Sequence, residues 1–375
     1  MSFSKDVLRS DELAIYDLRE LYRKFGYSQY KVSRFEEYDL YARNKSFLVS
    51  ENILTFTDTN GKLMALKPDV TLSIIKNISA DDKEMYKLYY NENVYRTSAE
   101  SHGFKEIVQT GLECIGNIDI FSESEVVMLG VRSLENISND YIMDISHMGI
   151  IEGLLDGASV EDADRIAILK YVESKNLDGI RKLCVSRGID ERISDNICAL
   201  TEMYLPLDQA LQLLEGMLIN PKVDRAYDEL KQISDIMSLY GISKNLYFDF
   251  SVVNDCNYYD GIIFKGFING IPDSVLSGGR YDRLLERMGK KQQAIGFAVY
   301  LDRLERFGVE DAKYDTDVLL IYDDDVEPKK IIDTVNLLNE SGKTVRTART
   351  VDEAGRYRQL VKIDKGGIEI LEAND

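Results

Sequence analysis

Histidine, paired cysteines, long apolar runs and basic clusters are all scarce in this sequence. His102 and His147 are the two histidines, too few for a histidine-based metal cluster. The four cysteines form no Cys-x-x-Cys pair, so neither a disulfide framework nor a zinc site is indicated. We expect no metal and no cofactor.

Basic residues are outnumbered as well. The chain has 46 Lys and Arg against 65 Asp and Glu, a formal net charge of −19, and no long run of Lys and Arg. An acidic surface repels phosphate backbones, which argues against broad nucleic-acid binding. No apolar signal region opens the chain and no apolar run approaches membrane-spanning length. We expect a soluble, cytoplasmic protein with no membrane contact.

What is present is the composition of an ordinary globular protein, with 44% hydrophobic and 30% charged residues over 375 positions. Strand-like alternation is interrupted at 149–240, where only helical periodicity is found. The pattern predicts an α+β core over 1–310 with a helical insertion at 149–240. A small tail, 311–375, is predicted to be a strand-helix-strand unit with a further strand at 367–371.

A hairpin and a proline turn precede the first candidate site residues. Asn60-Gly61 separates two alternating segments, the strongest short hairpin signal in a sequence. The second segment leads into Lys67-Pro68-Asp69-Val70-Thr71, where a helix is predicted to begin. Asp69 and Thr71 at this point could bind an ammonium group, or could cap the helix.

Two later segments place polar groups on the predicted sheet. Gln109, Gly111 and Glu113 share one face of the strand 107–116, because side chains alternate along a strand. They could form the floor of a site or a solvated outer face. Tyr258 and Tyr259 join two strands, where they suit a small polar ligand or a packed core.

The segment 276–304 organises the C-terminal part of the core. It opens with a glycine pair before Arg280, which by itself indicates only a tight turn. An apolar run, 294–301, is predicted to be a buried strand. It leads into Asp302-Arg303-Leu304, which puts one cation at the start of a helix.

Taken in order, these motifs resemble the catalytic core of class II aminoacyl-tRNA synthetases over residues 10–307, and histidyl-tRNA synthetase in particular. The resemblance lies in several separate segments rather than in one motif. They are Leu66-Lys67-Pro68-Asp69-Val70-Thr71; Tyr95-Arg96 with Gln109 to Glu113; and Gly278 to Asp282 with Gly296-Phe297 and Asp302-Arg303-Leu304.

The resemblance implies an antiparallel sheet flanked by helices, a self-dimer through the core, and a pocket for L-histidine. The implied histidine-binding residues are Asp69, Thr71, Gln109, Glu113, Tyr258 and Tyr259. Carboxylates and a Gln amide can accept hydrogen bonds from an ammonium, and tyrosine hydroxyls can meet a carboxylate or imidazole. Arg96 and Arg303 could contact a phosphate-bearing ligand or could hold the motif geometry.

Departures from the synthetase pattern indicate that catalysis is lost. Asn254 stands where the family has an arginine that stabilises charge during adenylation, and Lys105 is the one basic residue left in the motif 2 loop. The motif 1 region also lacks its expected proline near Phe35-Glu36. The tail resembles the first part of an anticodon-binding domain at most, so no tRNA partner and no catalytic residues are expected.

A synthetase core that keeps a histidine pocket without catalysis resembles the regulatory subunit of short-form ATP phosphoribosyltransferase. That family implies a hetero-octamer with a separate catalytic subunit, which the regulatory subunit activates and makes sensitive to feedback inhibition by histidine. Two alternatives remain at this point. One is a divergent histidyl-tRNA synthetase, against which Asn254 argues. The other is a histidine-binding protein that acts alone or on another partner.

Overall fold

The computed structural model describes most of the chain and divides it into two compact units. The described residues are 8–48, 52–79, 85–97, 103–252, 258–304, 313–351, 355–364 and 366–374. The first unit is Met1–Phe307 and the second is Gly308–Asp375. Asn254 and His102, two positions discussed above, lie outside the described residues.

A nine-stranded sheet forms the centre of the first unit, in the order β1-β5-β6-β12-β11-β10-β7-β9-β8. Its strands are β1 Ser28–Gln29, β5 Tyr86–Thr97, β6 Phe104–Gly116, β7 Tyr141–His147, β8 Tyr204–Pro206, β9 Leu246–Asp249, β10 Ile262–Ile268, β11 Leu276–Arg280 and β12 Gln293–Tyr300. Neighbouring strands are antiparallel except β1 with β5 and β7 with β9. The predicted sheet flanked by helices is confirmed and is mainly antiparallel, and its two parallel pairs make it mixed. Both parallel pairs join strands separated by a long connection, as parallel pairing requires.

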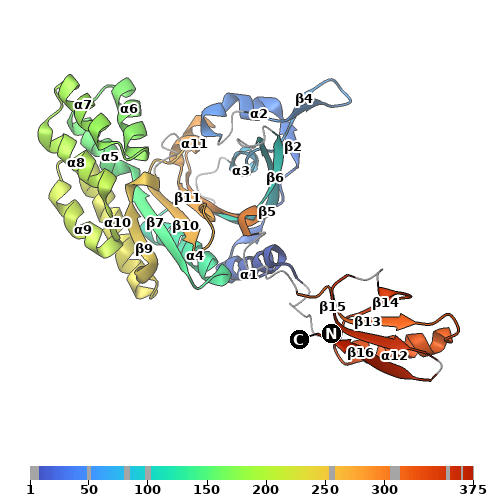
Figure 1. Ribbon diagram of the computed structural model, residues 1–375. Helices are drawn as coiled ribbons and strands as arrows, with labels where there is room; N and C mark the ends of the chain where they lie inside the picture. The colour runs from blue at the N-terminus through green and yellow to red at the C-terminus, as the bar shows by residue number, and fades with distance from the viewer. Residues whose placement is uncertain are drawn as a thin grey trace. The chain divides into compact units, whose positions relative to one another are not determined.

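Two long helices, α1 Ser10–Lys24 and α4 Ile120–Ile137, pack against one face of this sheet (Figure 1). Leu18 and Tyr22, one helical turn apart on α1, are completely buried. The Tyr22 hydroxyl is 3.0 Å from Oγ of Ser133 on α4, so the two helices are joined by a polar contact inside an apolar core. This packing leaves the opposite sheet face for other elements.

That opposite face carries three short helices, α2 Tyr38–Arg43, α3 Thr71–Asn77 and α11 Asp282–Arg287, which belong to a second core cluster. A small sheet of β2 Phe35–Glu37, β4 Leu63–Leu66 and β3 Thr55–Thr57 adjoins them. The predicted hairpin at Asn60-Gly61 is confirmed, with β3 and β4 antiparallel and Gly61 at a positive φ of 81°. Asp58 Oδ1 accepts hydrogen bonds from the backbone N of Asn60 and of Lys62, both at 2.8 Å, which explains the tight turn.

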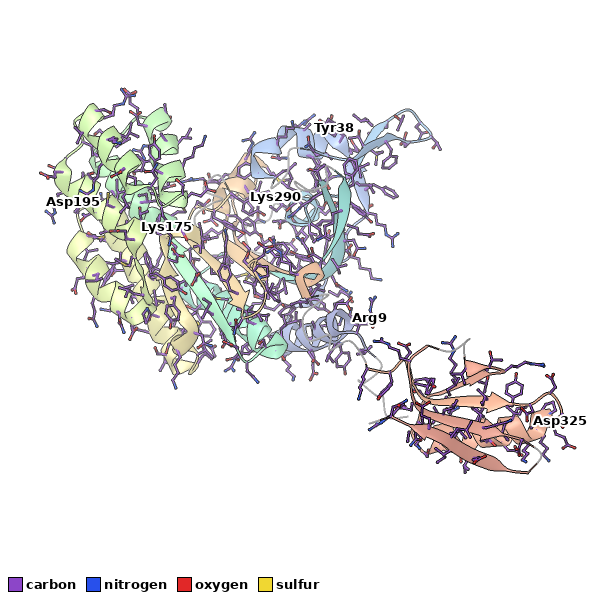
Figure 2. All side chains as sticks on the ribbon, in the orientation of Figure 1. Arg9, Tyr38, Lys175, Asp195, Lys290 and Asp325 are labelled. Carbon is purple, nitrogen blue, oxygen red and sulfur yellow. The ribbon has the colours of Figure 1, made fainter. Side chains whose placement is uncertain are left out.

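The helices between β7 and β9 form one body at the edge of the sheet (Figure 1). They are α5 Met148–Gly157, α6 Asp162–Glu173, α7 Leu177–Arg187, α8 Glu191–Glu202, α9 Leu207–Leu214 and α10 Pro221–Leu239. Figure 2 labels Lys175 at the border of this body, where its Nζ lies 3.5 Å from Asp249 of β9. The prediction that 149–240 contains no strand was wrong. β8 pairs with β9, but three residues ending in a proline carry too little periodicity to be recognised.

The second unit is a four-stranded sheet in the order β14-β13-β15-β16, with one helix. Its elements are β13 Thr316–Tyr322, α12 Pro328–Glu340, β14 Val345–Ala348, β15 Tyr357–Ile363 and β16 Ile368–Ala373. The predicted strand-helix-strand and final strand are present, and β15 was missed. This strand pairs parallel with β13 at the centre of the sheet. Three polar residues, Arg358, Gln359 and Lys362, interrupt its apolar pattern.

Candidate ligand-binding site

A cavity of about 210 Å³ lies on the sheet face opposite α1 and α4, between the strands and the short helices. It is bounded by β5, β6, β11 and β12 from below and by the start of α3 and the Tyr258-Tyr259 segment from the sides. Pockets for drug-sized ligands are typically about 300–1,000 Å³, so this volume suits a single small molecule.

Seven of the eight predicted site residues line this cavity. They are Asp69, Thr71, Arg96, Gln109, Glu113, Tyr258 and Tyr259. Sequence positions as distant as 69 and 259 are therefore brought to one place. Their roles in binding histidine remain a prediction.

Two residues on β6 form the floor of the cavity. Gln109 and Glu113 point to the same side with Gly111 between them, and both are almost completely buried. The Nε2 atom of Gln109 has no hydrogen-bond partner among the described residues. Because buried polar groups are nearly always paired, this amide is expected to donate to a bound ligand.

Two glycines make room for neighbouring side chains in this floor. A Cβ added at Gly111 would come within 2.6 Å of the Tyr90 hydroxyl, and one added at Gly296 would lie 2.5 Å from Leu112 O and would overlap the Glu113 carboxylate. Neither site has room for a side chain. The glycines therefore admit the buried side chains of Tyr90 and Glu113 beneath the cavity.

Glu113 is the centre of the site. It accepts a hydrogen bond from Oγ1 of Thr71 at 2.7 Å and another from the hydroxyl of Tyr281. Burial raises the pKa of Glu113 to about 8, although these two hydrogen bonds oppose the shift. An ionised Glu113 would therefore be stabilised by a cationic group entering the cavity.

Asp69 has the capping role that its sequence position allowed, and its binding of an ammonium group stays a prediction. Its Oδ1 accepts a hydrogen bond from the backbone N of Leu72 at 2.8 Å, so it caps α3, and the residue also lines the cavity. Burial raises the pKa of Asp69, while its hydrogen bond from Leu72 and the nearby Arg96 oppose the rise. The preceding turn is fixed by the completely buried Lys67, whose Nζ lies 2.8 Å from Glu92 Oε2.

Tyrosine rings make up much of the wall. Tyr258 packs against Tyr259 and Tyr281 with ring centroids 4.8 and 5.7 Å away. Burial raises the pKa of both Tyr258 and Tyr281 well above its usual value, so their hydroxyls stay neutral and can donate hydrogen bonds. Tyr281 was missed as a site residue, although it directly follows the Gly-Gly-Arg motif and that position was the available signal.

Arg303 does not line the cavity. Its Nη1 donates to the backbone O of Ser274 and lies 3.2 Å from Ser274 Oγ, and its guanidinium carbon lies 4.4 Å from the centre of the Tyr300 ring. Of the two alternatives left open for Arg303, these contacts favour the geometric role. Arg96 does line the cavity, with its Nε donating to Pro68 O at 3.0 Å.

The raised pKa of Glu113 predicts how stability depends on pH. In the unfolded chain the carboxyl ionises near pH 4.5, whereas in the folded chain it stays protonated up to about pH 8. Its contribution to stability is therefore complete below pH 4.5 and is lost as pH rises through 8, with a slope of at most about one proton per chain. Denaturant unfolding at several pH values should show this slope, and Glu113→Gln should remove it. An unchanged slope in the variant would contradict the assigned pKa.

Neither a metal cluster nor a membrane helix is found in the described part of the chain. No three His, Cys, Asp or Glu side chains there are arranged to hold a metal ion. Among the same residues, no helix has the length and apolar character needed to cross a bilayer.

Comparisons with known proteins identify the same architecture. A family model described as histidyl-tRNA synthetase matches residues 6–304. The ATP phosphoribosyltransferase regulatory subunit of Thermoanaerobacter sp. (strain X514) is 30% identical over 290 residues, which cover 76% of this chain and 75% of that protein. A crystal structure of an ATP phosphoribosyltransferase regulatory subunit/histidyl-tRNA synthetase from Bacillus halodurans matches with a TM-score of 0.77 at 22% identity, covering 94% of this chain and 93% of that one.

A further structure, the ATP phosphoribosyl transferase (HisG:HisZ) complex from Thermotoga maritima, matches with a TM-score of 0.62 at 20% identity over 78% of this chain and 97% of that one. The fold and the buried pocket thus define a class II synthetase-like core with a cavity of small-molecule size. The chain belongs to the histidyl-tRNA synthetase family, in the branch of the ATP phosphoribosyltransferase regulatory subunits.

Proposed function

We propose that this chain is the non-catalytic regulatory subunit of a short-form ATP phosphoribosyltransferase and that L-histidine binds in the cavity around Glu113. The observation that carries the histidine site is the buried carboxylate itself. It lies beside Thr71 and Tyr281 on a floor where the Nε2 atom of Gln109 has no hydrogen-bond partner among the described residues. Its role is regulation of the first step of histidine biosynthesis.

The chemistry of the cavity supports a zwitterionic ligand with a ring. Asp69 and Glu113 supply acceptors for an ammonium and an imidazole N–H, while Arg96 and the Gln109 amide supply donors for a carboxylate. The tyrosine walls give a ring an apolar surface with hydroxyl groups at its edge. Histidine has all of these groups.

The surroundings of the cavity support the lack of catalysis. Charge developing on a phosphate in a transition state needs cations aimed at it. Here Lys105 is paired with Asp302 at 2.7 Å and Arg303 is held by Ser274. Two of the basic groups nearest motif 3 are thus already engaged within the protein.

The family supports a proposal for the assembly. The Thermotoga maritima structure is named as a complex of two components, and by analogy we propose a separate catalytic subunit as this chain's partner, in a cytoplasmic hetero-octamer. We also propose a self-dimer through the synthetase-like core and no binding of tRNA. Histidine can inhibit such an assembly only if it binds the inactive arrangement more tightly than the active one.

The test is ATP phosphoribosyl transfer by a short-form catalytic subunit from the same organism, measured with and without this chain across a histidine titration. Activity that rises on adding the chain and falls with histidine is the expected result. No change on adding the chain would contradict the regulatory role. Histidine-dependent ATP–pyrophosphate exchange by this chain alone would instead show a working synthetase.

A further inference from the structure

The side chain of Tyr300 lies between the cavity and the guanidinium of Arg303. Tyr300 is the last residue of β12 and lines the cavity, whereas Arg303, which lies over its ring at 4.4 Å, does not. Asp302, which directly precedes Arg303 in the following turn η6 Leu301–Leu304, is paired with Lys105 at 2.7 Å. The ring therefore covers the face of the guanidinium that would otherwise be available to a ligand.

An exposed guanidinium at this place would have a definite ligand preference. Arginine stacks its planar face on aromatic rings and pairs with phosphate oxygens, a combination that suits nucleotides. Removing the Tyr300 ring would leave a ring-sized space next to that face and would join it to the cavity. The Arg303 orientation would persist, because its hydrogen bonds to Ser274 do not involve Tyr300.

We propose that Tyr300 is a specificity-determining residue that restricts the cavity to a free amino acid and excludes ligands that carry a nucleotide. This inference rests on the proposed use of the cavity for histidine. It adds a statement of which ligands the cavity excludes. A regulatory site benefits from such a restriction, because a histidine sensor in the cell must respond to histidine in the presence of abundant adenine nucleotides.

The experiment uses the full chain and two probes, L-histidine and adenosine 5′-monophosphate, in isothermal titration calorimetry. Unchanged protein should bind histidine and show no measurable binding of the nucleotide. Tyr300→Ala should bind the nucleotide at least about tenfold more tightly than unchanged protein does, the scale of a desolvated stacking contact with a cation. Histidine should still bind to Tyr300→Ala, since the contacts proposed for its ammonium and imidazole groups remain.

Three further variants make the result specific. Tyr300→Phe keeps the ring and should exclude the nucleotide as unchanged protein does. Tyr300→Val removes the ring with a residue suited to a strand, and it replaces Tyr300→Ala if that variant does not fold. Tyr300→Ala combined with Arg303→Met should lose the gained binding. Inorganic pyrophosphate serves as a probe that has phosphate groups but no base. Its affinity should rise less in Tyr300→Ala than the affinity of the nucleotide does.

Each outcome separates this inference from the proposed function. Three results would overturn the closure by Tyr300. Unchanged protein could bind the nucleotide, Tyr300→Phe could gain as much nucleotide affinity as Tyr300→Ala, or the gained affinity could survive Arg303→Met. Histidine binding to every variant with no nucleotide binding to any would also overturn it and would leave the proposed function intact. The expected nucleotide pattern without histidine binding to any variant would support the closure and contradict the proposed histidine site.

Discussion

Replacing Glu113 with glutamine should weaken histidine binding by about a hundredfold or more. The amide keeps the size of the side chain, and its oxygen can still accept from one of the two hydroxyls, Thr71 or Tyr281, while its NH2 group faces the other. It removes the charge that pairs with a cation. Truncating one partner of a buried charge pair costs about 2–5 kcal/mol, and each 1.4 kcal/mol is about tenfold in affinity. Titration calorimetry at pH 8 measures the loss directly.

The same variant should also lose the pH dependence of binding. A cation that binds at Glu113 requires the ionised carboxylate, whose pKa in the ligand-free protein is about 8, so affinity in unchanged protein should fall as pH is lowered from 8 to 6. Glu106→Gln is the matched control, because Glu106 lies on the same strand but is exposed and accepts from Tyr95 at 3.0 Å. Equal histidine affinity in Glu113→Gln and in the control would show that the cavity has been assigned wrongly.

Replacing Gly296 with alanine should remove histidine binding and destabilise the fold. The new methyl group would lie 2.5 Å from the backbone O of Leu112 and would overlap the Glu113 carboxylate, so both strand and site must move. Overpacking of this kind typically costs about 1–3 kcal/mol of unfolding free energy. Thermal melting should show the lower stability, and calorimetry should show no histidine binding in the folded variant.

Gly216→Ala is the control for this prediction. Gly216 lies in a turn of the helical insertion, η3 Glu215–Met217, and a Cβ there would meet nothing within 4 Å. Its replacement should leave stability within about 0.5 kcal/mol and binding unchanged. If Gly296→Ala bound histidine as well as Gly216→Ala does, the carboxylate could not be part of the binding site.

Local rules were enough to predict the hairpin and the floor of the site. The Asn60-Gly61 turn depends on two adjacent residues, and the shared face of Gln109 and Glu113 follows from the strand period of two. Capping by Asp69 was likewise one of two local alternatives, and the structure shows that one carboxylate can cap α3 and line the cavity together. The order of the motifs then indicated that these residues meet.

Contacts between distant parts of the chain could not be predicted in this way. The hydrogen bond from Tyr281 to Glu113 joins residues 168 positions apart, and the position of Tyr281 after the Gly-Gly-Arg motif does not show which residue it contacts. The position of Arg303 depends on its hydrogen bonds to the distant Ser274, so its basic character in the sequence left both an anion contact and a geometric role open. β8 is a strand only because β9 lies beside it.

The tyrosine walls also give this protein an optical property. The chain has 23 tyrosines and no tryptophan, and five tyrosines line the cavity: Tyr90, Tyr258, Tyr259, Tyr281 and Tyr300. Its intrinsic fluorescence is therefore tyrosine emission, undistorted by energy transfer to an indole. A phenol that donates to a carboxylate, as Tyr281 does to Glu113, emits weakly because the carboxylate quenches it. A ligand that binds this carboxylate in place of Tyr281 would increase the fluorescence of Tyr281. Ligand binding in the pocket can therefore be followed in the unlabelled protein.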